Sequence, residues 1–158
     1  MSDYTGPGVY EISPANALGK RVSAWGGATT SGTAVKLYSP AQAENLIWEI
    51  VAAGGERGDP ETGNRQYHII GVQSGLLLCA AQDGTDTDVT LSTRSVRHGS
   101  SRWEIIPAKN GYYQFASALN RNKWLAVRGQ LNADGTPLMT YAKTDAPHFQ
   151  FKLSKPNF

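Results

Sequence analysis

Apolar and polar residues follow the same order three times along this chain. Each time, a segment led by a tyrosine precedes a short apolar run, then an alternating run, and last an aromatic residue beside a charged one. Alternation with a period of two residues is typical of strands that bury one face. The predicted strands, repeat by repeat, are residues 9–12, 21–24, 33–38 and 48–50; 67–70, 76–79, 88–92 and 103–105; and 112–115, 123–126, 137–141 and 151–153.

Turn residues separate these strands, and helical periodicity is nearly absent. Asp83-Gly84 and Asp134-Gly135 mark two of the turns. Only the linkers 41–45 and 99–102 are expected to form a single helical turn, as spacers between strands. The glycine-rich segment 54–63 predicts a solvated loop within one domain.

The threefold repetition predicts the fold class. A unit of this kind cannot bury its own apolar face, so the three units must close on one another. We therefore expect one all-β domain, residues 1–158, of three homologous lobes at approximately 8–51, 66–108 and 111–154. A chain of 158 residues is long enough to bury about 70% of its unfolded surface without covalent staples.

Cysteine content and the N-terminal segment indicate a soluble protein. The one cysteine, Cys79, allows no internal disulfide and lies in an apolar run, where we expect a buried thiol. The first residues lack the basic start and apolar core of a signal peptide, and no stretch approaches the roughly 20 apolar residues that span a bilayer. We expect a protein that is cytoplasmic or released without a signal peptide, with no membrane insertion.

The net charge of +2 is too small to indicate a nucleic-acid partner. One local exception is a basic cluster formed by Arg94, Arg97, His98 and Arg102, which could hold phosphate or sulfate. The cluster has no interleaved aromatic residues for base stacking, and a solvated surface loop is the simpler interpretation.

Catalytic chemistry has little support in the sequence. The three histidines, His68, His98 and His148, are isolated, and no metal-ligand or phosphate-loop spacing occurs. Glu49 and Glu104 are the candidate carboxylate pair for glycoside hydrolysis. They fill the same position in two repeats, however, which favours outward-facing strand residues between buried neighbours. We expect no enzyme, no cofactor and no metal.

Candidate binding chemistry concentrates in the first repeat. Trp25 follows a strand directly and stands beside glycines that let a ligand approach the backbone. If the chain closes as a hairpin, the rings of Trp25 and Tyr38 flank a shallow cleft with Asn45 at its floor and Lys36 at its edge. An aromatic face covers the C–H side of a pyranose, while amides and charged groups orient its hydroxyls. The alternative is that Trp25 packs on a neighbouring loop and Tyr38 lies at the edge of the core.

The whole repeat resembles the ricin-B-type β-trefoil lectins, and the resemblance covers nearly all of the chain. It rests on the opening aromatic, a second strand like Gly-x-x-Leu and a closing motif like Gln-x-Trp. Residues 8–50 are similar to the small, disulfide-free fungal agglutinins of sclerotium-forming ascomycetes, which bind galactose or N-acetylgalactosamine. The resemblance implies twelve strands in three lobes, six forming a barrel and six a hairpin cap, with up to one sugar site per lobe.

In the first lobe, the family's sugar-binding positions fall on Ser23, Gly26, Tyr38 and Asn45. Lys36 stands where a glutamine is common, and Ser23 replaces the usual aspartate, which weakens the expected acceptor of the sugar's hydroxyl groups. Backbone groups of Ala24 and Gly26, together with the Trp25 ring, could substitute for that acceptor.

The other two lobes have diverged from this pattern. The second lobe has Cys79, Gln82, Ser92 and Ser100 at these positions, which offer no stacking ring, so we expect no site there. The third lobe has Ala126, Gly129, Tyr141 and His148, so it keeps the ring and loses the acceptor. We expect a weak second site at Gly129, Tyr141 and His148.

The resemblance thus implies a noncatalytic carbohydrate-binding lectin for terminal galactose or N-acetylgalactosamine on glycans and glycoproteins. One competent lobe per chain implies a homodimer, because cross-linking of cells needs two sites. Two other functions remain open. A β-trefoil protease inhibitor would act through the loop 54–63, and a heparin- or phosphoinositide-binding trefoil would use Arg94, Arg97 and Arg102.

Overall fold

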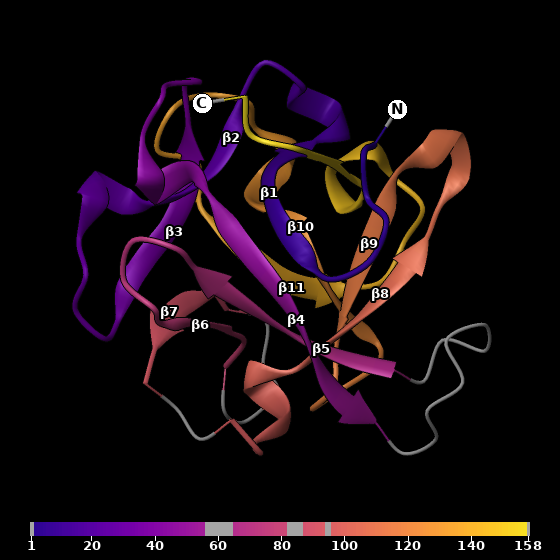
Figure 1. Ribbon diagram of the computed structural model, residues 1–158. Helices are drawn as coiled ribbons and strands as arrows, with labels where there is room; N and C mark the ends of the chain where they lie inside the picture. Colours follow the sequence, from indigo (N-terminus) through magenta and orange to yellow (C-terminus); the bar gives the residue numbers. More distant parts are fainter. Residues whose placement is uncertain (1, 56–64, 82–86, 94–95, 158) are drawn as a thin grey trace.

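The computed structural model describes residues 2–55, 65–81, 87–93 and 96–157, and it confirms the all-β fold (Figure 1). Twelve strands occur in these residues, four in each predicted repeat. They are β1 (Gly8–Pro14), β2 (Arg21–Ala24), β3 (Thr33–Tyr38), β4 (Trp48–Gly55), β5 (Arg65–Gly71), β6 (Leu77–Cys79), β7 (Thr90–Ser92), β8 (Trp103–Pro107), β9 (Tyr113–Ser117), β10 (Lys123–Val127), β11 (Leu138–Ala142) and β12 (Phe151–Ser154).

Six of the strands close into a barrel. Antiparallel pairing runs from β1 to β4, β5, β8, β9 and β12, and β12 returns to pair with β1. The other six strands form the hairpins β2–β3, β6–β7 and β10–β11, one in each repeat. Bridges join the hairpins to one another at Thr33 and Leu91, at Lys36 and Pro137, and through Asp88. This is the β-trefoil arrangement, with a barrel and a hairpin cap.

The tyrosine that opens each repeat lies opposite the aromatic residue that closes it. The register pairs Tyr10 with Trp48, and the same relation recurs in the other lobes between Tyr67 and Trp103 and between Tyr113 and Phe151. Such directly opposed pairs are the stabilising unit of a sheet. The three closing aromatics are fully buried and form the centre of the core.

The two buried tryptophans need a hydrogen-bond acceptor for their indole N–H groups. Trp48 donates to the Val22 carbonyl and Trp103 to the Leu78 carbonyl, both at 2.9 Å. Each bond ties the second strand of a lobe to its barrel strand. Phe151 fills the third position without any polar group, so no acceptor is needed there.

Short 3-10 turns are more frequent than the sequence pattern predicts. Both predicted linkers contain one, η3 (Glu44–Leu46) and η4 (Gly99–Ser101), but five others occur in the described residues. They are η1 (Ala15–Ala17), η2 (Trp25–Gly27), η5 (Lys109–Gly111), η6 (Arg128–Gln130) and η7 (Pro147–Phe149). The expectation of only two was wrong because a single turn has too few residues to show helical periodicity.

The two glutamates of the barrel differ in exposure. Glu49 is exposed on β4, as expected, whereas Glu104 on β8 is only 5% exposed and forms an ion pair with Arg121, 2.8 Å between Oε2 and Nε. The prediction that both point outward was therefore wrong for Glu104. A charged partner from the loop between β9 and β10 allows this carboxylate to be buried.

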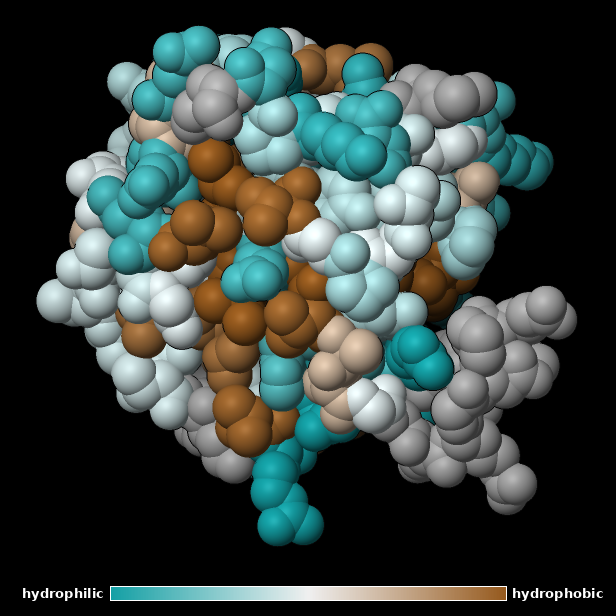
Figure 2. Space-filling model, in the orientation of Figure 1, coloured by the Kyte–Doolittle hydropathy of each residue, from teal (hydrophilic) through white to brown (hydrophobic). Residues whose placement is uncertain are grey.

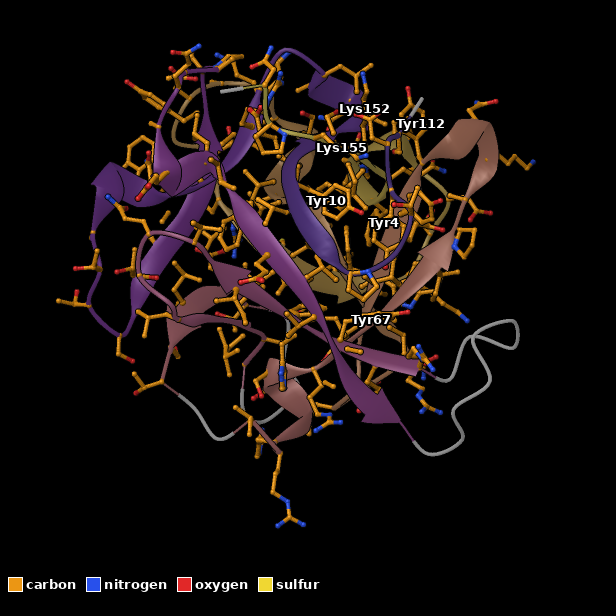
Figure 3. The ribbon with its side chains drawn as sticks, viewed as in Figure 1. Tyr4, Tyr10, Tyr67, Tyr112, Lys152 and Lys155 are labelled. Carbon is orange, nitrogen blue, oxygen red and sulfur yellow. The ribbon has the colours of Figure 1, made fainter. Side chains whose placement is uncertain are left out.

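The N-terminal arm lies across one end of the barrel. Asp3 donates its N–H to the Leu153 carbonyl, and the Tyr10 hydroxyl donates to the Gly6 carbonyl at 2.7 Å. Tyr4 packs its ring against Tyr10, with 5.4 Å between centroids, and Figure 3 shows these two rings near Tyr67 inside the ring of strands. Burial raises the pKa of the Tyr4 phenol.

The outer face of the barrel carries apolar side chains around one carboxylate. Val9 on β1, Glu49 on β4 and Ile70 on β5 are neighbours in the register. Val9 is 42% exposed. Figure 2 shows apolar side chains gathered on this face of the molecule. Within the described residues, no helix is long and apolar enough to cross a membrane.

Candidate functional site

The hairpin β2–β3 presents alternate residues to the core and to the surface. Val22 and Leu37 are paired and buried in the core. Ser23 is paired with Lys36, and Tyr38 lies two residues beyond Lys36, so these three side chains share the outer face. The period-two pattern of the sequence therefore places the predicted site residues of both strands together.

The turn η2 brings Trp25 back toward the outer face of this hairpin. Gly26 has φ 67°, a left-handed conformation that is costly for residues with a side chain. As a result, the indole of Trp25 meets the phenol of Tyr38 nearly at right angles, with 6.0 Å between ring centroids and 80° between planes. Edge-to-face geometry of this kind is favourable for aromatic pairs.

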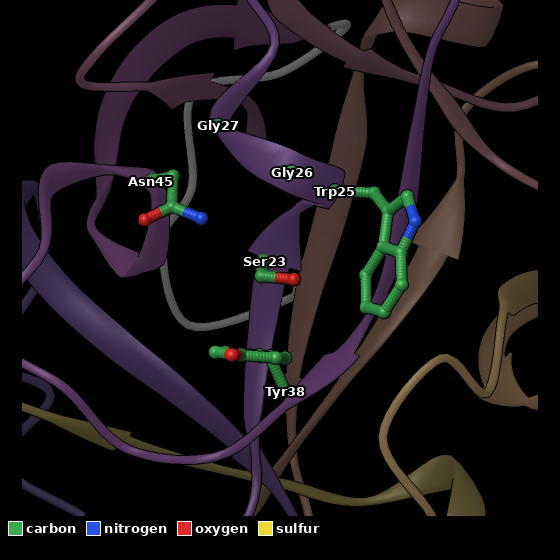
Figure 4. Close-up of a pocket in the computed structure, with 6 residues that line it drawn as sticks. All are labelled: Ser23, Trp25, Gly26, Gly27, Tyr38 and Asn45. Carbon is green, nitrogen blue, oxygen red and sulfur yellow. The ribbon is translucent and has the colours of Figure 1, made fainter.

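These residues surround a cleft of about 410 Å³ (Figure 4). Its walls are formed by Ser23, Trp25, Gly26, Gly27, Tyr38 and Asn45. The structure thus brings together five of the seven residues predicted for the first-lobe site, and adds Gly27. Tyr38 is 44% exposed, so its ring is accessible to a ligand.

Two polar side chains of the cleft are held by the backbone. Ser23 is 1% exposed, and its hydroxyl donates to the Lys36 carbonyl at 2.7 Å. Its oxygen therefore remains only as an acceptor for a ligand. The Asn45 amide donates to the Ala24 carbonyl at 3.1 Å, which fixes the orientation of the amide. The bond also engages one of the backbone groups that could have substituted for the missing acceptor.

Lys36 lies beside the cleft rather than in its wall. Its ammonium nitrogen lies 5.1 Å from the centroid of the Trp25 ring, a cation–π distance. This position agrees with the expectation that Lys36 lies at the edge of the site.

Trp25 also packs on a neighbouring lobe. A Cβ added at Gly135, in the β10–β11 hairpin, would lie 3.5 Å from Cη2 of the Trp25 indole. The predicted alternative for this residue, packing on a loop, is therefore correct for one edge of the ring, while the ring also lines the cleft.

An ionic contact strengthens this joint between the first and third lobes. Asp134 lies 2.7 Å from the Lys20 ammonium and accepts hydrogen bonds from the Ser39 hydroxyl at 3.0 and 3.1 Å. The Lys20 hydrogen bond and, to a lesser degree, Ser39 hold the pKa of Asp134 below its usual value.

The third lobe repeats the cleft at smaller volume, about 260 Å³. Gly129, Tyr141 and His148, the predicted weak site, all line it. Gly129 has φ 63° in η6, which matches the conformation of Gly26 in η2. Ala126, which sequence analysis aligned with Ser23, also lines the cleft. The other lining residues, which sequence analysis did not select, are Val127, Gln130, Met139 and Phe149. These residues could have been found from the sequence, because they align with first-lobe residues in the repeat.

Substitutions make this third-lobe cleft less polar than the first. Met139 occupies the position of Lys36, and Ala126 that of Ser23. His148 replaces Asn45, and its ring packs against Phe149 with 4.7 Å between centroids. Burial lowers the pKa of His148, which favours the neutral imidazole at pH 7.

The second lobe has small buried side chains at the equivalent positions. Cys79 is 1% exposed, as expected for a buried thiol, and Ser100 is fully buried. The Ser100 hydroxyl lies 2.7 Å from Nδ1 of His98. Ser92 is also buried, and Gln82 lies outside the described residues. No stacking ring stands at these positions.

The remaining candidates have structural roles or lie outside the described residues. Arg102 of the basic cluster donates from Nε to Gln66 at 2.6 Å and from its terminal nitrogens to the carbonyls of Val96 and Ala53, so it fastens a loop to the barrel. Arg94 and most of the loop 54–63, which would act in a protease inhibitor, lie outside the described residues.

Comparison with known proteins assigns the family. Residues 56–141 match the family model described as "Ricin-type beta-trefoil lectin domain-like". An agglutinin of Sclerotinia sclerotiorum is 30% identical over 120 residues, which cover 75% of this chain and 74% of the agglutinin. The chain belongs to the ricin-type β-trefoil lectin family. Its resemblance to fungal agglutinins, predicted from the repeats, is thereby confirmed.

Solved structures of β-trefoil proteins agree with this assignment. The designed three-fold symmetric protein ThreeFoil superposes with a TM-score of 0.80 at 21% identity, over 94% of this chain and 99% of ThreeFoil. The ricin B-like lectin of Macrolepiota procera, solved in complex with lactose, superposes with a TM-score of 0.73 at 14% identity, over 98% of this chain and all of that lectin. At these identities the likeness shows the β-trefoil fold.

Proposed function

We propose that this lectin binds terminal galactose or N-acetylgalactosamine in the first-lobe cleft, without catalysis. The observation that carries the proposal is the Tyr38 ring, exposed at a cleft whose other walls are an indole and two fixed polar side chains. The axial hydroxyl of galactose leaves one face of the sugar as a C–H surface, and an aromatic ring covers such a surface well. Tyr38 is the stacking ring, and Trp25 closes the side of the cleft.

Polar contacts in this cleft provide the orientation of the sugar. The Ser23 oxygen accepts from a sugar hydroxyl, since its own proton is engaged. Asn45 also lines the cleft, with its amide held by the Ala24 carbonyl. Gly26 and Gly27 carry no side chain between a ligand and the backbone, so the sugar approaches the turn closely.

Relatives support a galactoside ligand. The Macrolepiota procera lectin was solved with lactose, a disaccharide that ends in galactose, and the Sclerotinia relative is an agglutinin. Neither Glu49 nor Glu104 lines a described cleft, which supports a noncatalytic role. We further propose that Gly129, Tyr141 and His148 form a second, weaker galactoside site in the third lobe.

We also propose that the lectin acts as a homodimer. A shallow site for one sugar binds at about millimolar strength, so a useful avidity needs two sites engaged together. A two-fold dimer whose interface lies away from Trp25 and Tyr38 presents two first-lobe clefts, and such closed dimers are the commonest soluble assembly.

Calorimetric titration tests the sugar specificity. Galactose, N-acetylgalactosamine, glucose and mannose are titrated into the wild-type lectin, and the same sugars into Tyr38→Ala. We expect binding of the first two sugars only, and its loss in the variant. Tyr112→Ala serves as the control, because Tyr112 lines neither described cleft. Binding that survives Tyr38→Ala, or inhibition of a protease by a lectin that binds no sugar, contradicts the proposal.

A further inference from the structure

The first-lobe cleft combines a cation at its edge with walls that carry no carboxylate. The six described lining residues are a serine, two aromatics, two glycines and an asparagine. The ammonium of Lys36 lies over the indole that forms one wall. Charge at this site is therefore positive, whereas the hydroxyls of a neutral sugar need no cation.

Lys36 is held where its charge reaches the cleft. Its carbonyl accepts from Ser23, and its backbone bridges to Pro137 on the other side. Buried neighbours, Val35 and Leu37, fix the direction in which its side chain leaves β3. The side chain is half-buried, and this restriction lowers the entropy that an ion pair with a ligand would cost.

The other charges around this hairpin are engaged with one another. Lys20 pairs with Asp134, and Arg21 with Glu11 at 3.0 Å. Within the described residues, Lys36 forms no ion pair with the chain itself. Glu44 is exposed next to Asn45 and does not line the cleft. The cation beside the cleft is thus balanced by no described carboxylate within it.

We propose that this lectin prefers galactosides that carry an acidic group, with Lys36 as the residue that recognises the anion. The ligand class is a galactose unit that bears a sulfate ester, or one that is joined by a glycosidic bond to a sugar acid whose carboxylate stays free. This inference rests on the proposed function, because the galactose ring itself occupies the cleft beside Tyr38. It adds that the anion lies at the edge, toward the Lys36 ammonium and the Trp25 ring.

The third lobe supplies an internal contrast. Met139 stands at the position of Lys36, so no lysine occupies that position although Tyr141 keeps the stacking ring. Lys143 lies 5.7 Å from the centroid of the Trp124 ring, but neither of these two residues lines the third-lobe cleft. The proposed contact between Lys36 and an anion therefore belongs to the first-lobe cleft. A lectin with one acid-selective and one neutral cleft distinguishes glycans that share the same galactose unit.

The test compares affinities for neutral and acidic ligands that share a lactose unit. Lactose, 3′-sulfolactose, 6′-sulfolactose and the two sialyllactoses are titrated calorimetrically into the wild type, Lys36→Gln and Lys36→Met. Lys109→Gln is the matched control, because Lys109 is an exposed lysine on η5 that lines neither described cleft. We expect at least one acidic ligand to bind about three- to tenfold more tightly than lactose to the wild type, as for a partly exposed ion pair. The sulfated and sialylated ligands separate a sulfate ester from a carboxylate.

In both Lys36 variants, the ratio of the acidic ligand's affinity to that of lactose falls to about one, while Lys109→Gln keeps the wild-type ratio. Raising the salt concentration lowers the wild-type ratio, because ions screen the contact. Equal binding of lactose and all acidic ligands by the wild type overturns the inference and leaves the galactoside proposal intact. A preference that persists in Lys36→Gln also overturns it. Failure of lactose and every acidic ligand to bind overturns both.

Discussion

Tyr38 and Tyr141 occupy the same position in two lobes and are exposed alike, at 44% and 50%. Tyr38 ends β3 and Tyr141 is the next-to-last residue of β11, and each lines a cleft beside a glycine in the left-handed conformation. The clefts differ in their polar groups and not in their stacking ring. We therefore expect differences in affinity to arise from Ser23 and Asn45, which the third lobe replaces by Ala126 and His148, and from Trp25, because no tryptophan lines the third-lobe cleft.

Removing each ring separates the two clefts. We expect Tyr38→Ala to lower galactoside affinity at least tenfold, a loss of about 1.4 kcal/mol, which abolishes detectable binding at a millimolar site. Tyr141→Ala lowers total binding only slightly. Both rings are exposed, so each substitution changes the free energy of unfolding by about 0.5 kcal/mol or less. Calorimetry and urea denaturation measure these effects, and a larger loss of binding for Tyr141→Ala contradicts the assignment of the main site.

Trp25 differs from Tyr38 because its indole also packs at Gly135 in another lobe. Trp25→Ala is expected to weaken galactoside binding. It should also lower the free energy of unfolding by about 1–2 kcal/mol, because it removes a half-buried ring from the contact between the first and third lobes. Trp25→Phe, which keeps an aromatic ring at the joint, should recover part of the stability. Urea denaturation of the two variants decides this, and a Trp25→Ala lectin as stable as the wild type would show that the contact contributes nothing.

The Asp134 contact predicts a pH-dependent stability. The folded-state pKa of Asp134 is lower than its unfolded value, so its contribution is fully present above the unfolded pKa and is lost as pH falls through the folded value. Asp134→Asn should therefore lower the Tm at pH 7, by a difference that shrinks as the pH falls below about 4 and vanishes once the pH lies below the folded-state pKa. Asp145→Asn, an exposed control on the same lobe, should show no such difference. Equal shifts in Tm for both variants at pH 7 would show that the Asp134 contact does not stabilise the fold.

The proposed homodimer is tested by its mass and by cross-linking of cells. Light scattering should give twice the mass of the chain, and the same preparation should agglutinate red cells. Tyr38→Ala should keep the dimer mass and lose agglutination, because the interface lies away from the cleft. Agglutination by a strictly monomeric lectin would show that the third-lobe cleft, with Tyr141, supplies the second site.

The strand order and the core were predictable because they depend on local periodicity. Alternation along each repeat indicates which face of a strand is buried, and the repeated aromatic positions indicate pairs such as Tyr10 and Trp48. The burial of Glu104 was not predictable, since its partner Arg121 belongs to a separate loop. Pairing of residues distant in sequence leaves no mark on a local pattern.

The candidate site was predictable as far as the repeat specifies it. The hairpin register places Ser23, Lys36 and Tyr38 on one face. The alternating pattern of the two strands predicts this arrangement once they are taken to pair as a hairpin. The hydrogen bonds that the Ser23 and Asn45 side chains donate to the backbone could not be predicted, because they depend on side-chain rotamers. Neither could the contact between Trp25 and Gly135, which joins two lobes.

The four tryptophans give the most direct test of the central claim. A ¹H–¹⁵N NMR titration with N-acetylgalactosamine observes each indole N–H separately. Trp25 lines the first-lobe cleft, Trp124 packs beside the third-lobe cleft, and Trp48 and Trp103 are buried with their N–H groups bonded to the backbone. We predict that the Trp25 signal shifts first and most, that Trp124 shifts only at higher sugar concentration, and that Trp48 and Trp103 stay in place. A titration that moves Trp124 before Trp25, or leaves all four signals unchanged, contradicts galactoside binding in the first-lobe cleft.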